Sequence, residues 1–172
     1  EKIVRHPDLV TLVGGGAANI EDLQRITKIS PFLVAADGGA VLADRAGIVP
    51  DMVIGDFDSV PEQLLAKLPQ DRLFRIAEQN STDFDKALRS ISAPLVLAVG
   101  FTGARMDHQL ATFHTLVRHP DQPCIVIGTR DILCLAPPDI TLDLEEGDVV
   151  SLFPMGSVSG SSDGLRWPID AL

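Results

Sequence analysis

The chain has 172 residues and a formal net charge of -10 at pH 7, with 45% hydrophobic and 22% charged residues. This apolar content is enough for one substantial core or two small ones, and it excludes a disordered chain. The negative charge argues against a nucleic-acid surface, which needs clustered Lys and Arg, and it favours metal ions or cationic ligands.

The longest apolar runs, such as Ala93–Gly100, are much shorter than the roughly 20 residues needed to cross a bilayer. The amino end shows no basic-then-apolar leader, so we expect a cytoplasmic location. Cys124 and Cys134 lie in apolar, strand-like surroundings outside any CxxC pair, which argues for buried thiols and against zinc. Because the chain starts at Glu1 and its pattern continues to Leu172, we expect residues to be missing at both ends.

Up to about residue 118, short apolar β-rich runs alternate with helix-like stretches. This rhythm predicts a mostly parallel sheet covered by helices. The expected strands are Val10–Val13, Leu33–Ala36, Met52–Ile54, Leu73–Ile76 and Leu95–Val99. The expected helices are Ile20–Ile26 after Asn19, Glu62–Lys67 after Pro61, Asp83–Ile91 after Thr82, and His108–Val117 after Asp107. In the last of them, Leu110, Phe113, His114 and Val117 share one face.

After His119 the pattern changes to short extended segments separated by turns. These segments are Cys124–Gly128, Ile132–Leu135, Ile140–Leu144, Val149–Phe153 and Ser157–Ser159. The pattern is typical of an all-β unit, which we expect to be a sandwich. The sequence therefore predicts an α/β fold, with a mostly parallel α/β sheet domain over residues 1–120 and a β-sandwich domain over residues 121–172.

Acidic residues gather where the predicted strands end. Their segments are AADGGA with Asp37, IGDFDS with Asp56 and Asp58, NSTDFDKAL with Asp83 and Asp85, and GFTGARMDH with Arg105, Asp107 and His108. In a parallel α/β sheet these positions are carboxyl-end sites, where ligands bind. We therefore expect them to form one rim.

Asp56 and Asp58 stand two residues apart, so in an extended segment both carboxylates project to one side, and Gly55 lets the backbone approach a ligand. A shared Mg2+ fits these hard oxygen ligands, because no His/Cys set competes for it. The alternative is a solvated turn or an Asx cap.

Asp83 and Lys86 share one helix face, with a carboxylate suited to a metal and an ammonium suited to a phosphate oxygen. The alternative is an ordinary surface ion pair, and Thr82 then only caps the helix.

Gly14, Gly15 and Gly16 stand between a strand and a helix, so their amides are candidates to cradle phosphate. The alternative is a tight βα turn, since neither a Walker loop nor the dinucleotide fingerprint is present.

The forked guanidinium of Arg105 suits the charge that develops in phosphoryl transfer. Asp107 and His108 follow in the same segment. The alternative to a role at the site is that Asp107 only caps the helix and His108 is a residue of its first turn.

Taken in order, ADGGA (36–40), GDFDS (55–59), Gln79 with TDFDKAL (82–88), GARMDH (103–108) and GLRWPI (164–169) resemble the signature blocks of the thiamin pyrophosphokinase family. The resemblance extends from Gly14 to Trp167. It implies an α/β amino domain, a β-sandwich carboxyl domain and a homodimer. It also implies an ATP- and Mg2+-dependent reaction in which thiamin and ATP give thiamin diphosphate and AMP.

The resemblance also implies roles for individual residues. Asp56, Asp58 and Asp83 are the implied metal ligands, and Asp37 is expected close to the nucleotide or the metal shell. The nucleotide is also expected to contact the Gly14–Gly16 segment, Gly38, Gln79, Thr82 and His108. Lys86, Arg105 and Asp107 are expected to bind or orient the reacting groups, with Asp83 or Asp107 accepting the proton of the thiamin hydroxyl.

Trp167, together with Gln79 and Asp83, is the expected thiamin contact, because an indole stacks on a flat cationic ring. Its alternative is a core Trp of the sandwich. The family places thiamin at the subunit interface, so Trp167 is expected to serve the partner's rim. The Ser/Thr/Asn-containing segment that follows the GLxW block in the family is absent here, which leaves half of the vitamin pocket without assigned residues.

Two rival functions share parts of this pattern. A pyrophosphokinase acting on another alcohol, such as a hydroxymethyl pterin, needs the same carboxylates, and only Trp167 and the β unit favour thiamin. A non-catalytic nucleotide or metal sensor also keeps the rim, although every charged position needed for turnover is present here.

Overall fold

The computed structural model describes residues 2–103 and 105–168. It divides into two units, Glu1–Ala136 and Pro137–Leu172. Ala104 of GARMDH and Ile169 of GLRWPI lie outside the described residues. No helix in the described part of the chain is long and apolar enough to cross a membrane.

The first unit is built on a seven-stranded sheet in the order β5-β4-β3-β2-β7-β8-β9. Its strands are β2 (Val10–Val13), β3 (Phe32–Ala36), β4 (Met52–Gly55), β5 (Leu73–Arg75), β7 (Val96–Val99), β8 (Cys124–Ile127) and β9 (Ile132–Cys134). All neighbours pair in parallel except β8 and β9, which are antiparallel. The mostly parallel sheet predicted from the sequence is confirmed.

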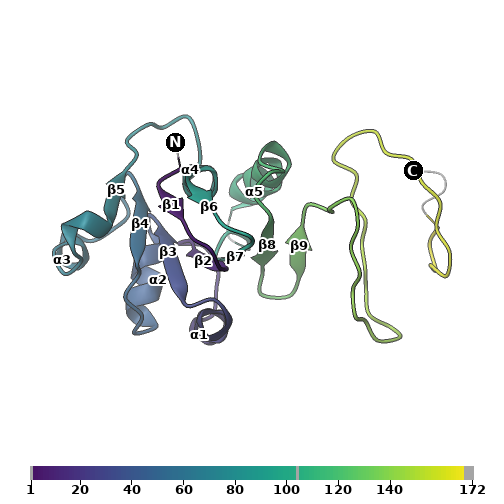
Figure 1. Ribbon diagram of the computed structural model, residues 1–172, viewed down its shortest axis with the longest axis horizontal. Coiled ribbons are helices and arrows are strands. Elements are labelled where there is room, and N and C mark those ends of the chain that lie inside the picture. Colours follow the sequence, from purple (N-terminus) through teal and green to yellow (C-terminus); the bar gives the residue numbers. More distant parts are fainter. Residues whose placement is uncertain (1, 104, 169–172) are drawn as a thin grey trace. The chain divides into compact units, whose positions relative to one another are not determined.

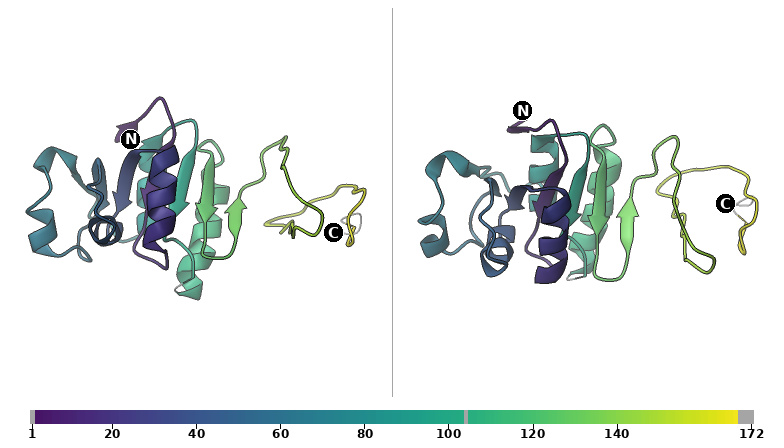
Figure 2. Two further views of the ribbon diagram at one scale, coloured as in Figure 1. Left: turned by 90° about the horizontal axis from the view of Figure 1, so that it is seen from below. Right: turned by 60° about the horizontal axis from the view of Figure 1, so that its bottom comes forward.

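The helices cover both faces of this sheet, as Figures 1 and 2 show. They are α1 (Ile20–Ile29), α2 (Gly39–Arg45), α3 (Glu62–Leu65), α4 (Asp83–Ser90) and α5 (Met106–Arg118), with a 3-10 turn at Gln70–Arg72. Leu23 and Ala43 of α1 and α2 belong to one buried cluster, whereas Phe84 and Leu116 of α4 and α5 belong to the other. The sheet is therefore the middle layer of three.

Two short strands, β1 (Val4–Arg5) and β6 (Ile91–Ser92), form a separate parallel pair that the sequence analysis did not anticipate. Lys2 donates to the carbonyl oxygen of Ile91 at 2.5 Å beside this pair. The pair ties the amino-terminal segment to the end of α4.

The segments 124–128 and 132–135 were expected in the second unit, and this is wrong. Val126 is fully buried in β8, and the division of the chain falls after Ala136. The strand β8 pairs with the apolar strand β7. This pairing provides hydrogen-bond partners for the backbone of β8 and buries its side chains. Cys124 is buried as expected, but Cys134 is exposed, because β9 lies at the sheet edge.

The second unit contains no helix or strand within residues 137–168. Large apolar side chains are exposed along it, including Leu142 at 53%, Val149 at 91% and Phe153 at 79%. The sandwich predicted from the alternation of these residues is thus not present in the unit as described.

Two details of α5 differ from expectation. Its N-cap is Arg105, and Asp107 lies in the first turn. The face shared by Leu110 and Val117 is exposed, whereas Thr112, Thr115 and Leu116 are the residues that α5 buries. Threonines at helical spacing pack as small residues here, which a hydrophobicity pattern does not register.

Candidate active site

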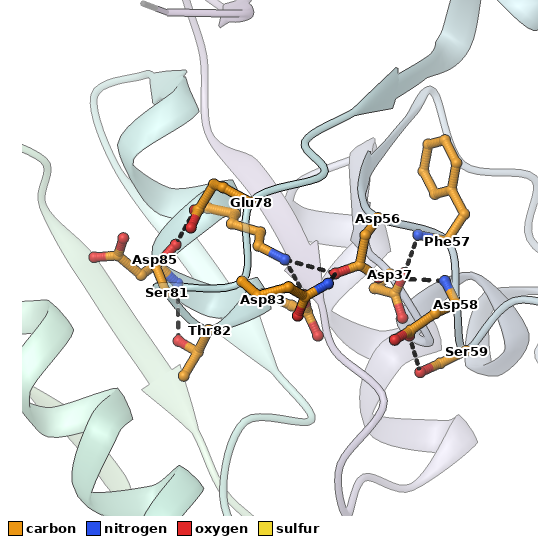
Figure 3. Close-up of polar contacts among 12 residues, drawn as sticks. Asp37, Asp56, Phe57, Asp58, Ser59, Glu78, Ser81, Thr82, Asp83 and Asp85 are labelled. Atoms are coloured by element: carbon orange, nitrogen blue, oxygen red, sulfur yellow. Dashed lines mark hydrogen bonds and ion pairs between the residues drawn. The ribbon is translucent and has the colours of Figure 1, made fainter.

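The ends of β3 and β4 place the first carboxylates. Asp37 follows β3 directly, and its Oδ1 accepts a hydrogen bond of 2.7 Å from the backbone N–H of Phe57, which follows β4 (Figure 3). Both residues have positive φ, 44° for Asp37 and 69° for Phe57. Non-glycine residues rarely adopt this region, and the hydrogen bond between the two loops supports the uncommon conformation of both.

Asp56 is the hub of the polar contacts. Its Oδ2 accepts hydrogen bonds from Lys86 Nζ at 2.8 Å and from Gln79 Nε2 at 3.0 Å, and its Oδ1 accepts one from the N–H of Asp58 at 3.2 Å. The hydrogen bond from Lys86 lowers the pKa of Asp56 to about 2. Asp56 is therefore ionised at neutral pH and is oriented by three donors.

Lys86 is buried, with 1% of its surface exposed, and it reaches Asp56 and, at 3.4 Å, Asp83. Burial opposes its charge, but its hydrogen bond to Asp56 and the negative charges of Asp83 and Asp56 outweigh this and raise the pKa of Lys86. The surface ion pair considered as the alternative does not describe this lysine, which is a buried cation inside a carboxylate cluster.

Carboxylate oxygens of Asp37, Asp56 and Asp58 lie within 4.8 Å of one another. Asp83, which the resemblance implied as a ligand, is not in this group of three. Three convergent hard oxygen donors fit Mg2+, which binds through one or two carboxylates and substrate phosphates. Asp37 and Asp56 are buried and Asp58 is exposed, so a ligand has access from one side.

Asp83 begins α4 on the other side of Lys86, and its side chain is 44% exposed. Burial and the neighbouring charge of Asp37 raise the pKa of its carboxyl above its usual range. Thr82 is the N-cap of α4, because its Oγ1 accepts from the N–H of Asp85 at 3.3 Å. The capping role considered for Thr82 is confirmed.

The three glycines after β2 have a packing role. The N–H of Gly14 donates to Val99 O and that of Gly16 donates to Gly100 O, both at 2.8 Å. A Cβ on Gly14 would lie 2.6 Å from the Gly100 oxygen, so this βα turn packs directly on the loop after β7. Two of the three amides expected at a phosphate are therefore already bonded, which supports the alternative of a tight turn.

Arg105 and Asp107 bind each other at the start of α5. Arg105 Nε and Nη2 donate to the two carboxylate oxygens of Asp107 at 3.1 and 2.6 Å, and both side chains are mostly exposed. This bidentate bond lowers the pKa of Asp107. Asp107 is therefore a weaker base than Asp83, whose pKa is raised.

A cavity of about 440 Å³ connects these loops. Its lining includes four residues of the predicted rim, Asp37, Asp83, Arg105 and His108, together with Gly15, Gly16, Gly38 and Thr82. The other four, Asp56, Asp58, Asp85 and Asp107, do not line it. The cavity lies where the strand order reverses between β2 and β7, which is the usual ligand site of open α/β sheets. Its volume is in the range of small-molecule sites.

Trp167 is in the second unit, and its side chain is exposed. The guanidinium carbon of Arg166 lies 5.4 Å from the centroid of its ring. Trp167 is 77% exposed, so it is not a core Trp within the described residues.

Some residues at the site were missed by the sequence analysis. Ser59, Phe101 and Thr102 also line the cavity, and Ser59 Oγ donates to Asp58 Oδ1 at 2.9 Å. On α4 itself, Arg89 binds Asp85 at 3.0 Å, and it also binds Glu78, in the loop before the helix, at 2.8 Å. The i,i+4 spacing of Asp85 and Arg89 was the available signal, but it is too common on helices to indicate a site.

Comparison with known proteins relates this chain to one family. Residues 23–127 match the family described as thiamin pyrophosphokinase, catalytic domain. The chain belongs to the thiamin pyrophosphokinase family. Its members include thiamine pyrophosphokinase 1 of Arabidopsis thaliana, which is 27% identical over 183 residues, and thiamine pyrophosphokinase of Bacillus subtilis, which is 32% identical over 117 residues.

The crystal structure of the Bacillus subtilis thiamine pyrophosphokinase has a TM-score of 0.57 to this chain at 29% identity, covering 70% of this chain and 60% of that one. The aligned regions cover 95% of this chain and 66% of the Arabidopsis protein, and 63% of this chain and 54% of the Bacillus protein. The chain thus spans between about half and about 70% of the length of the thiamin pyrophosphokinases it matches.

Proposed function

We propose that the protein is a thiamin pyrophosphokinase, which transfers a pyrophosphoryl group from ATP to the hydroxyl of thiamin and gives thiamin diphosphate and AMP. The observation that carries the proposal is the group of Asp37, Asp56 and Asp58 beside the cavity at the sheet's carboxyl edge, in a member of this family. Such a group of acids has little use in a purely structural module.

Asp37, Asp56 and Asp58 would hold Mg2+, which supplies charge neutralisation for the triphosphate. Asp56 and Asp83 bind the ammonium of Lys86, and Asp37 and Asp58 lie beside Asp56, so the negative charge of these four carboxylates exceeds the one positive charge and favours a cation. Lys86 fixes the orientation of Asp56, and its buried charge offsets part of the repulsion. This assignment replaces Asp83 with Asp37 among the ligands that the resemblance implied.

Asp83 is then the proposed acceptor of the proton from the thiamin hydroxyl. Its raised pKa makes it a better base than Asp107, and it lines the cavity. As the hydroxyl oxygen bonds to the β-phosphorus, the bond between that phosphorus and the oxygen bridging to the α-phosphorus breaks, and AMP leaves. Arg105, which also lines the cavity, is proposed to compensate the charge on the phosphoryl oxygens.

The nucleotide is proposed to contact Gly15, Gly38, Thr82 and His108, and thiamin to contact Gln79, Asp83 and Trp167. We further propose that residues 137–172 form part of a β-sandwich in a homodimer whose thiamin site lies at the subunit interface. The exposed apolar side chains of this segment support a covering partner, since such surfaces are normally buried. A cytoplasmic location stays a prediction.

The decisive test is to incubate the full-length protein with ATP, Mg2+ and thiamin and to resolve the nucleotide products. AMP with thiamin diphosphate is the expected result, because ADP would indicate transfer of one phosphoryl group only. AMP formed only with another alcohol would replace the substrate and keep the mechanism. No nucleotide turnover would favour a sensor and overturn the proposed activity.

A further inference from the structure

The amide of Gln79 bonds a cluster carboxylate although its own segment has no regular structure. Gln79 Nε2 donates to Asp56 Oδ2 at 3.0 Å, the same oxygen that Lys86 binds. Gln79 lies between β5 and α4 in a stretch without helix or strand. A long, flexible side chain loses rotamer freedom in such a contact, so the backbone beneath it must be held from elsewhere.

The residues on both sides of Gln79 are tied to Arg89 on α4. Arg89 Nη2 donates to Glu78 Oε1 at 2.8 Å, and Arg89 Nη1 donates to Ser81 Oγ at 3.2 Å. Glu78 closes the turn itself, because its carboxylate accepts from the N–H of Asn80 at 2.7 Å and from the hydroxyl of Ser81. The segment Glu78–Ser81 is thus one hydrogen-bonded loop with Arg89 as its external anchor.

Arg89 is in turn fixed by a buried acid. Its Nη1 donates to Asp85 Oδ2 at 3.0 Å, and Asp85 is only 4% exposed. The other oxygen of Asp85 lies 2.8 Å from His119 Nε2, just after α5. The helix α4 therefore has two polar sides, one carrying Asp83 and Lys86 at the cluster and one holding the loop through Arg89.

We propose that Arg89 is a positioning residue. Its guanidinium fixes the Glu78–Ser81 loop and thereby holds the Gln79 amide on Asp56, which sets the orientation of that carboxylate. The planar guanidinium holds its donors on separate nitrogens, so Nη1 binds Ser81 and Asp85 while Nη2 binds Glu78. The three donors of an ammonium lie on one nitrogen and do not reproduce this spread. The consequence for metal binding rests on the proposed function; the consequence for the loop does not.

The test compares Arg89→Gln, Gln79→Ala and the double variant by calorimetric titration with MnCl2 without nucleotide, Mn2+ being the probe for the Mg2+ site. Outer partners of metal ligands contribute about 10-fold to 100-fold in affinity, so we expect each single variant to lose about tenfold. The double variant should lose no more than either single one, because both changes remove the same contact. Arg25→Gln, at an exposed position of α1, is the matched control and should bind as the parent does.

Hydrogen exchange of the amides of residues 78–81 is the second readout, and it does not depend on metal or activity. Arg89→Gln should speed this exchange at least about tenfold, with the β2 amides unchanged, and Arg89→Lys should restore part of the protection. Unchanged exchange in both Arg89 variants, or losses of Mn2+ affinity that multiply in the double variant, would overturn the proposal. If the parent binds no Mn2+, the metal assignment fails, and exchange alone decides the role of Arg89.

Discussion

At the scale of residues, the site is organised around one buried ion pair. Lys86 and Asp56 are 1% and 8% exposed, and their charged atoms lie 2.8 Å apart. Removing one partner of a buried pair leaves an uncompensated charge, which costs about 3–5 kcal/mol in typical cases. If Asp56 is removed, Asp83 still lies 3.4 Å from Lys86. We therefore expect the loss in free energy of unfolding to be at the lower end of that range.

Asp56→Asn tests the metal assignment. Asn keeps the size of the side chain but removes the charge, so we expect turnover to fall on the order of 100-fold or more, whereas the far-ultraviolet circular dichroism spectrum stays that of the parent. Asp71→Asn, at an exposed position of the 3-10 turn, is the control and should retain activity. An active Asp56→Asn enzyme would remove Asp56 from the metal site.

At the scale of elements, close backbone contacts set how the loops meet. Gly39 begins α2, and a Cβ at this position would overlap the carbonyl oxygen of Val13 at the end of β2. Asp37 stands two residues before Gly39, and its carbonyl oxygen accepts from the N–H of Ala40. A glycine at position 39 therefore allows the helix to start close enough to the sheet to place the Asp37 carboxylate.

Gly39→Ala is expected to lower the free energy of unfolding by about 1–3 kcal/mol, since the overlap with backbone must be relieved by moving α2. Urea unfolding measures the change. Gly156→Ala is the matched control, because a Cβ there meets nothing within 4 Å, and it should be close to neutral. Equal stabilities of the two variants would show that α2 does not need this close approach.

The loop before α4 should give the protein a specific sensitivity to acid. Hydrogen bonds from Ser81 and Arg89 lower the pKa of Glu78 from 4.5 to about 2. Because the pKa is lower in the folded state, the stabilisation is complete above pH 4.5 and is lost as the pH falls from 4.5 towards 2. Glu78→Gln should therefore lose less stability than the parent over this interval.

Urea midpoints measured at pH 6 and pH 3 test this expectation, with Glu62→Gln at an exposed position of α3 as the control. The difference between the parent and Glu78→Gln should shrink at pH 3, and the control should follow the parent. A difference that is the same at both pH values would contradict the role of the Glu78 carboxylate.

At the scale of the whole molecule, the chain consists of two units that differ in their amount of helix and strand. The first buries its sheet between two helical layers, whereas the second exposes alternating apolar residues such as Ile140, Leu142 and Leu144. Alternation of this kind is typical of strands with one covered face. We therefore predict that Ile140–Leu144 and Val149–Phe153 pair as strands in the assembled protein.

Hydrogen exchange of the full-length protein measures this pairing. The amides of the two segments should exchange at least about a hundredfold more slowly than in an unfolded chain, because ladder hydrogen bonds must open first. The amides of β2, in the middle of the sheet, provide the internal reference for slow exchange. Exchange at the unfolded rate in both segments would contradict the sandwich.

The sequence alone indicated the parallel sheet, its five strands β2, β3, β4, β5 and β7, and the clustering of acids at their carboxyl ends. It did not indicate the short strand β6. The spacing of hydrophobic residues and the residue types of turns are local properties of the sequence. The carboxyl ends of the strands in a parallel sheet meet at one edge, whichever side chains they carry. It also indicated the family, since the motifs lie in order along the chain.

The tertiary structure decided which partners these residues have. Lys86 and Asp56 are 30 residues apart in sequence, and Gln79 and Asp56 are 23 apart, so no local pattern reports their contacts. In the same way, β8 joins the sheet rather than a second domain because β7 offers it a hydrogen-bonding edge and an apolar surface. Burial, pairing and pKa depend on such long-range neighbours, and these exist only once the chain has folded.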